Sequence, residues 1–111
     1  MSVKLKLPTD PWFVYIARCA DGTLYTGTAL DVKARMIAHN AGRGARYTRG
    51  RVPIVLCARQ RCSSRGDALR LEFAIKRLSR DAKLGLLESR RLSSFARRLL
   101  SARSRSAGGS P

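Results

Sequence analysis

The chain has 111 residues and a mass of 12.3 kDa, and its 23 lysines and arginines against 7 aspartates and glutamates give a formal net charge of +16. This length allows one small domain and excludes a second catalytic module, because a domain needs on the order of 100 residues to bury an adequate core. Hydrophobic residues make up 44% of the chain, which excludes a disordered polyelectrolyte, so we expect a folded protein.

The first half of the chain predicts a hairpin followed by a helix. Residues 12–19 are rich in aromatic and β-branched types and predict a strand that is largely buried on both faces. A turn signal over residues 20–22 precedes a returning strand over residues 23–28. Asp31 is a suitable N-cap for a helix that runs to about residue 41.

The second half predicts a basic loop over residues 42–51, a third strand over residues 52–59 and a long helix from residue 63 or 64 to about residue 89. The apolar residues of that helix recur at three- and four-residue steps and predict a core-facing stripe: Leu71, Ala74, Ile75, Leu78, Ala82 and Leu86.

The element order predicts an α/β (α+β) fold, with a small three-stranded antiparallel sheet flanked by helices. We expect residues 1–11 to be a loose lead-in and residues 12–88 to form the domain. Residues 89–111 are a basic tail, expected to be helical for a turn or two around Phe95 and then disordered.

The charge distribution favours nucleic acid as a partner. Residues 32–66 hold nine basic residues and no acidic one, and the tail holds six arginines and no acid. Arginine supplies 18 of the 23 positive charges, and its guanidinium can bind phosphate oxygens with two hydrogen bonds. The alternative is a solvated surface that reflects an arginine-rich composition.

Other compartments and ligands are disfavoured. The longest apolar stretches fall short of the roughly 18 to 20 residues that span a bilayer, and the N-terminus lacks the features of a signal peptide. Three cysteines cannot form a fully paired disulfide framework, and they lack the second ligand pair of a zinc site. We expect a cytoplasmic protein with reduced thiols and no membrane contact.

The hairpin register decides whether Tyr15 and Tyr25 share a face of the sheet. A two-residue turn would pair Arg18 with Tyr25 and send the two rings to opposite faces. A three-residue loop with Gly22 in the left-handed conformation pairs Ala17 with Tyr25, which places both rings on one face. We predict the second register, because glycine occupies the position that this loop type requires.

Arg35 and His39 lie four residues apart and therefore share one face of the first helix, with Val32 and Met36 beside them. An arginine among apolar neighbours needs an anionic partner, and a scissile phosphate would serve. The alternative is that Arg35 extends its head group to solvent and His39 has a structural role.

Glu72 is the only acidic residue between Asp67 and Asp81, and two roles are open to it. It can form an i,i+4 ion pair with Lys76, worth roughly 0.3 to 0.5 kcal/mol. It can also ligate Mg²⁺, which binds through one or two carboxylates and keeps several waters.

The basic loop alternates glycine with arginine around a single tyrosine. Glycine lets the backbone approach phosphates, and Tyr47 can stack on a base, whereas the alternative is a flexible solvated loop. The expected nucleic-acid-binding residues are Arg43, Arg46, Tyr47, Thr48, Arg49 and Lys76.

Several motifs in order resemble the GIY-YIG nuclease domain. Val14-Tyr15-Ile16 and Tyr25-Thr26-Gly27 resemble the paired tripeptides that name the family, with Val14 in place of glycine and Thr26 in place of isoleucine. The resemblance covers about residues 12–84 and is closest to small stand-alone bacterial members. The further matching patterns are Asp31-x3-Arg35-x3-His39-Asn40-x-Gly42, Gly44-Ala45-x-Tyr47-Thr48 and Ala68-x3-Glu72-x3-Lys76.

The resemblance implies a divalent-metal-dependent endonuclease that hydrolyses DNA, with branched, damaged or single-stranded substrates of the kind met in DNA repair. It implies catalytic roles for Tyr15, Tyr25, Arg35 and His39, and it implies that Glu72 holds one Mg²⁺ or Mn²⁺ ion. Tyr15 would help to deprotonate the attacking water, directly or with Tyr25 or His39, and its phenolate would need a nearby cation because the ordinary tyrosine pKa is about 10. The expected location is the nucleoid, with DNA as the partner and a second protein for targeting.

The alternative function is a non-catalytic basic module on a nuclease-like fold, binding DNA or RNA or associated with the ribosome. The presence of Tyr15, Tyr25, Arg35 and Glu72 together favours the enzyme, since a decayed site should have lost at least one of them.

Overall fold

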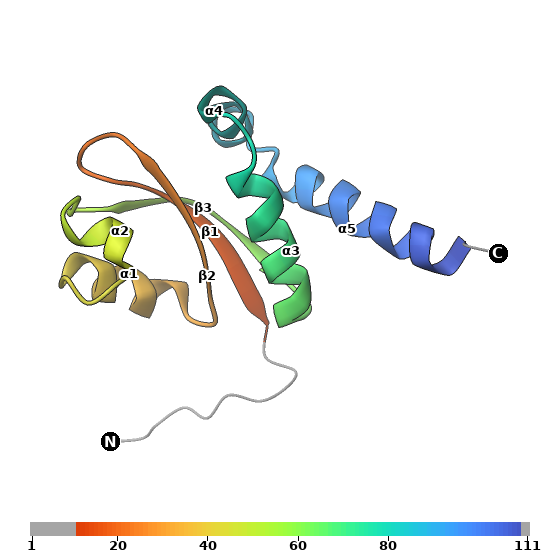
Figure 1. Ribbon diagram of the computed structural model, residues 1–111, viewed down its shortest axis with the longest axis horizontal. Coiled ribbons are helices and arrows are strands. Elements are labelled where there is room, and N and C mark those ends of the chain that lie inside the picture. Colours follow the sequence, from red (N-terminus) through yellow and green to blue (C-terminus); the bar gives the residue numbers. More distant parts are fainter. Residues whose placement is uncertain (1–10, 110–111) are drawn as a thin grey trace, which may run out of the picture.

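The computed structural model describes residues 11–109, with side chains described as far as residue 101 (Figure 1). Most of the expected lead-in and the last two residues lie outside these ranges. Strands β1 (Trp12–Arg18), β2 (Leu24–Ala29) and β3 (Val55–Cys62) form one antiparallel sheet in the order β2-β1-β3. The predicted fold class, a three-stranded antiparallel sheet with helices, is confirmed.

The hairpin has the register that the glycine position predicted. Ala17 pairs with Tyr25, and Gly22 adopts the left-handed conformation with a φ of +86°. The loop closes with a hydrogen bond from the Cys19 amide to the Thr23 carbonyl at 2.8 Å. Tyr15 and Tyr25 consequently lie on the same face of the sheet, with ring centroids 6.2 Å apart.

Helices α1 (Val32–Asn40) and α2 (Arg46–Arg49) cover the face of the sheet that carries the two tyrosines (Figure 1). α1 begins as predicted at Asp31, whose side chain accepts a hydrogen bond from the Ala34 amide at 3.0 Å. The α2 turn lies inside the segment that the sequence predicted to be a loop, so that part of the prediction was wrong.

The third strand starts three residues later than predicted, at Val55. Pro53 has no N–H to donate to a ladder. The next residue, Ile54, gives its backbone groups to a side chain instead: its amide donates to Asn40 Oδ1 at 2.7 Å, and its carbonyl accepts from Asn40 Nδ2 at 3.1 Å. These bonds fix the end of α1 to the chain that enters β3.

The long helix predicted after residue 63 is divided into α3 (Arg65–Lys76) and α4 (Arg80–Glu88). The division occurs at Ser79, whose hydroxyl accepts from the Ala82 amide at 3.1 Å and so caps a new helix. Ala82 is exposed rather than part of the core stripe. The sequence pattern could not separate one helix from two, because Leu86 remains in contact with the core across the break.

The tail forms an 18-residue helix, α5 (Leu92–Gly109), where a turn or two was expected. Leu92 and Ala96 are buried against the core, and Phe95 and Leu99 pack beside them. This burial stabilises a helix that its polar composition alone would not.

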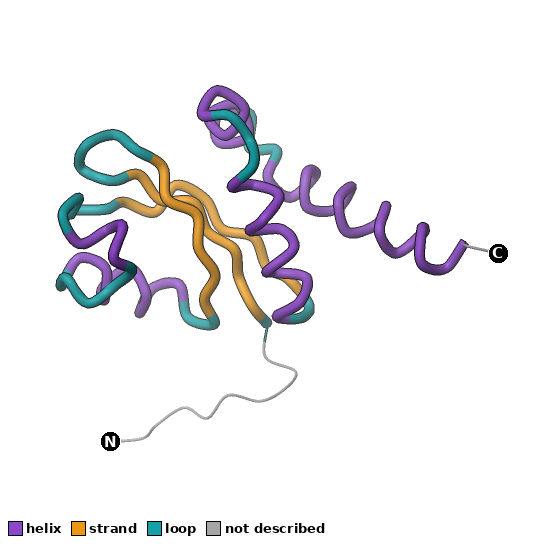
Figure 2. The backbone as a smooth tube through the Cα atoms, viewed as in Figure 1, coloured by secondary structure: helices purple, strands orange, loops and turns teal. Residues whose placement is uncertain are grey.

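The two faces of the sheet are covered by different helices, as Figure 2 also shows. Val14 and Ile16 of β1 pack with Leu71 and Ile75 of α3 and with α5. Tyr15 and Ala17, which alternate with them, point to the opposite face. Within residues 11–109, no helix is long and apolar enough to cross a membrane.

Candidate active site

A buried chain of hydrogen bonds links β1, α1 and α2. The Tyr15 hydroxyl lies 2.8 Å from His39 Nε2, and His39 Nδ1 lies 2.8 Å from Thr48 Oγ1. The Thr48 hydroxyl donates to the Ala45 carbonyl at 2.9 Å. Tyr15, His39 and Thr48 are all fully buried, so their polar groups depend on this series of hydrogen bonds for their partners.

The hydrogen bond from Thr48 to Ala45 determines which atom is the donor in each of the other two hydrogen bonds. Because the Thr48 hydroxyl gives its only hydrogen to Ala45, its oxygen must accept from His39 Nδ1. A neutral imidazole that donates at Nδ1 accepts at Nε2, so the Tyr15 hydroxyl donates to His39. The arrangement is a proton relay that runs from Tyr15 to His39.

The burial of the relay shifts both titratable groups toward their neutral forms. Burial raises the pKa of Tyr15 to about 12, the neighbouring Tyr25 adds to the rise, and Arg35 opposes it. Burial also lowers the pKa of His39 below its ordinary value, and the positive charge of Arg35 lowers this pKa further. At neutral pH, Tyr15 is therefore a phenol and His39 a neutral acceptor.

Tyr25 packs on both members of the relay. Its ring centroid lies 5.3 Å from that of His39 and 6.2 Å from that of Tyr15. These contacts hold the Tyr15 and His39 rings in the geometry that their hydrogen bond requires.

Two glycines leave the space that the relay occupies. A Cβ at Gly27 would lie 2.6 Å from the Tyr15 hydroxyl, and a Cβ at Gly44 would lie 2.1 Å from His39 Nδ1. Both distances are well inside van der Waals contact. Gly27 closes the second tripeptide of the sequence motif, so its place in that motif has a steric reason.

Arg35 and Glu72 complete the cluster. Both lie close enough to Tyr15 for their charges to act on its pKa in opposite directions. Arg35 is half-buried and lines an open groove of about 470 Å³ beside α1. The Glu72 side chain, on α3, is 17% exposed and forms the predicted ion pair with Lys76, Nζ to Oε2 at 3.0 Å.

Glu72 offers a single carboxylate, the kind of ligand that a hard divalent cation such as Mg²⁺ or Mn²⁺ takes from a protein. The described part of the chain contains no group of three or more His, Cys, Asp or Glu side chains that could hold a metal ion. Zinc sites need three or four protein ligands, whereas Mg²⁺ uses one or two carboxylates and takes its other ligands from water and substrate. Glu72, together with phosphate oxygens, meets the second requirement.

Five of the six residues predicted to bind nucleic acid divide into three groups. Arg43, Arg46 and Arg49 are exposed on and beside α2. Lys76 is engaged with Glu72. The expectation for Thr48 needs correction, because this side chain is fully buried and bonds to His39, which leaves it no surface for nucleic acid.

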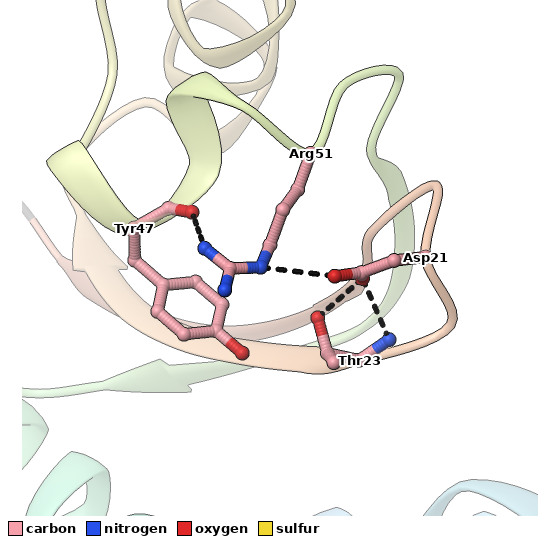
Figure 3. A network of polar contacts seen from close by, with 4 residues as sticks. All are labelled: Asp21, Thr23, Tyr47 and Arg51. Atoms are coloured by element: carbon pink, nitrogen blue, oxygen red, sulfur yellow. Dashed lines mark hydrogen bonds and ion pairs between the residues drawn. The ribbon is translucent and has the colours of Figure 1, made fainter.

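The ring of Tyr47 packs against other residues of this protein. It stacks on Tyr25 with centroids 5.8 Å apart, and the Arg51 guanidinium lies 4.1 Å over its ring. Arg51 also donates to the Tyr47 carbonyl at 2.6 Å and pairs with Asp21 at 3.0 Å. Figure 3 shows these contacts together with those of Thr23. Hydrogen bonds from Thr23 at the hairpin tip, with Arg51 adding to their effect, lower the pKa of Asp21.

The clamp of Asp21, Arg51 and Tyr47 fixes the α2 segment to the hairpin, and the sequence did not predict it. Asp21 served only as a turn signal, and Arg51 was one basic loop residue among several. No local signal connects residues 30 positions apart. In contrast, the sequence held a signal for a structural role of Thr48. Its place in the motif with Gly44 indicated a fixed position, although it did not indicate the contact with His39.

Comparisons with known proteins match the same part of the chain. A family model described as the GIY-YIG catalytic domain matches residues 11–84. The UPF0213 protein of Nitratidesulfovibrio vulgaris is 51% identical over 78 residues, which cover 70% of this chain and 71% of that relative. A UPF0213 protein of Staphylococcus aureus is 46% identical over 81 residues, which cover 73% of this chain and 99% of that relative.

A solution NMR structure of a UPF0213 protein from Bacillus halodurans is 44% identical to this chain, covers 70% of it and 83% of the other chain, and superposes with a TM-score of 0.47. The relay residues, Arg35 and Glu72 all lie inside residues 11–84, the range that the family model matches. The chain therefore belongs to the GIY-YIG family.

Proposed function

We propose that this protein is an endonuclease that hydrolyses DNA phosphodiester bonds with the help of one divalent cation, and that it acts on branched, damaged or single-stranded DNA. Proteins with a GIY-YIG domain are generally endonucleases, and they commonly use a divalent metal. The observation that carries the proposal is the buried relay from Tyr15 to His39 beside Arg35 and Glu72.

In the proposed reaction, Tyr15 is the general base, and because its side chain is fully buried, substrate binding must first open a path for water to its hydroxyl. Its oxygen takes a proton from the attacking water while its own proton passes to His39 Nε2 along the existing 2.8 Å hydrogen bond. The proton that leaves the water is thus balanced by the one that arrives on His39. Thr48 keeps the imidazole oriented throughout, because it continues to accept from Nδ1.

The charged residues act on the phosphate. Arg35 favours the Tyr15 phenolate and can donate to the non-bridging phosphate oxygens as negative charge develops on them. Glu72 would hold the divalent cation, which supplies additional positive charge to the transition state when bound. The exposed Arg43, Arg46 and Arg49 are proposed to hold the backbone of the substrate.

The test is cleavage of a panel of duplex, single-stranded and branched DNA and RNA in Mg²⁺ or Mn²⁺ by the protein and by its Glu72→Ala and Tyr15→Phe variants. We expect cleavage by the unmodified protein and losses of at least 100-fold in both variants, each still folded by circular dichroism. Tyr15→Phe should melt at a lower temperature than the unmodified protein, because His39 Nε2 loses its partner. Cleavage that persists in both variants would indicate a contaminant. Binding without cleavage of any substrate would support the non-catalytic module instead.

A further inference from the structure

Helix α5 lies outside the part of the chain that the family model matches. It begins at Leu92, whereas the match ends at residue 84. The Staphylococcus aureus relative is 99% covered by its 81-residue match, which leaves it almost no length for a further helix. The catalytic domain of this family can therefore exist without α5, and this helix needs its own explanation.

The two sides of α5 differ in chemistry. Leu92 and Ala96 are buried, and Phe95 and Leu99 pack against the core beside them. The side that faces solvent forms an open groove of about 660 Å³, lined by Arg91, Ser94, Arg97, Arg98 and Ser101.

The three arginines of this groove are exposed, and within residues 11–101 they have no acidic partner. The ion pairs found among residues 11–101 join other residues, and no acid occurs anywhere in residues 89–111. The eight residues from Arg91, directly before α5, to Arg98 span about 10 Å along a helix axis, which is about three phosphate steps of one DNA strand. The two serines add hydroxyl donors of the kind that commonly contact phosphates.

The composition of the groove favours a polyanion, rather than a folded protein, as its binding partner. Protein interfaces have cores enriched in aromatic residues and methionine, whereas the side chains up to residue 101 that line this groove are arginines and serines. Three adjacent guanidinium groups offer paired donors to successive phosphates.

We propose that the arginine face of α5 (Arg91, Arg97 and Arg98) binds the phosphate backbone of nucleic acid, and that it is a second contact, separate from the catalytic cluster. The proposal rests on the proposed function in taking nucleic acid as the substrate. In Figures 1 and 2, α5 lies on the far side of α3 from α1 and α2, and it packs on the opposite face of the sheet from Tyr15, so this contact is made away from the catalytic cluster. It adds affinity without base recognition, because phosphates carry no sequence information.

The experiment measures binding in a Glu72→Ala background, which prevents cleavage. A labelled 30-bp DNA duplex and an RNA duplex of the same sequence are titrated by fluorescence anisotropy at several salt concentrations, with and without the triple change Arg91→Gln, Arg97→Gln and Arg98→Gln. Glutamine resembles arginine in helix propensity, so α5 should persist, as circular dichroism can verify. If three phosphate contacts are lost, the slope of log K against log salt falls by about 2.7, and the affinity at 100 mM salt falls more than tenfold.

The matched control removes the same charge elsewhere, from exposed arginines on or beside β1, α3 and α4, as Arg18→Gln, Arg77→Gln and Arg80→Gln. An equal loss in the control, or an unchanged salt slope in the α5 triple, would overturn the proposal. A larger loss on DNA than on RNA would identify DNA as the ligand, and equal losses would identify the phosphate backbone of either.

The outcomes separate this proposal from the nuclease. If the salt slope of the α5 triple falls as expected but the protein cleaves none of the panel, the α5 contact is supported and the nuclease is not. If the protein cleaves and the triple behaves like the control, the nuclease is supported and the α5 contact fails. On active protein, we expect the α5 triple to raise KM for a 30-bp substrate and to leave kcat unchanged.

Discussion

Replacing His39 with glutamine tests the proton relay directly. Glutamine can still accept a hydrogen bond from Tyr15, but it cannot take the proton. With a pKa of about 12, Tyr15 is ionised in only about 1 molecule in 10⁵ at pH 7, equivalent to about 7 kcal/mol. Transfer to His39 avoids forming a free phenolate, so we expect His39→Gln to lower kcat by about 10² to 10⁴.

The pH dependence distinguishes the relay from a structural role of His39. Only neutral His39 accepts a proton, and its pKa is lowered, so activity of the unmodified protein should be level above pH 6.5 and fall at lower pH. In His39→Gln the phenolate must form by loss of a proton to solvent. The rate should then rise about tenfold per pH unit between pH 7 and 9.

The assay is single-turnover cleavage of a labelled substrate from the panel, measured from pH 5 to 9 with saturating Mg²⁺. Thr48→Val removes the acceptor of His39 Nδ1 and should also lower the rate. Thr26→Val is its control, since Thr26 is also buried but its hydroxyl has no partner among the described residues. A His39→Gln rate within threefold of the unmodified protein, with the same pH profile, would refute the relay.

Three further predictions concern the space around the Tyr15 ring, the hydrophobic core and the stability of the protein at acid pH. Gly27→Ala should move the Tyr15 ring and lower kcat at least tenfold in the same assay, whereas Gly50→Ala, with open space at its Cβ, should not; equal rates would contradict the steric argument. Leu71→Ala should cost about 2 to 5 kcal/mol in urea denaturation, against less than about 1 for the exposed Leu69→Ala, and equal costs would contradict the assigned core. Folding lowers the pKa of His39, so the contribution of His39 to the free energy of unfolding is present above pH 6.5 and is lost as pH falls through the lower folded pKa. Urea denaturation at pH 7 and pH 5 should show this loss of stability. The loss should be smaller in His39→Gln.

The sequence by itself determined the elements whose signals are local. The position of Gly22 was sufficient to predict the hairpin register, because only one loop type places glycine there in the left-handed conformation. Asp31 likewise predicted the start of α1. The motif spacing indicated which residues belong to the cluster, since Arg35 and His39 must share a helix face.

Only the tertiary structure decided how these residues act together. Thr48 was predicted to bind nucleic acid, yet it orients His39, because the α2 turn folds back over α1 and buries it. The same holds for α5, whose length depends on burial of Leu92 and Ala96 against distant elements rather than on helix propensity. Long-range contacts of this kind leave no periodic pattern in the chain, and so the direction of the relay and the separate arginine face of α5 emerged only from the folded protein.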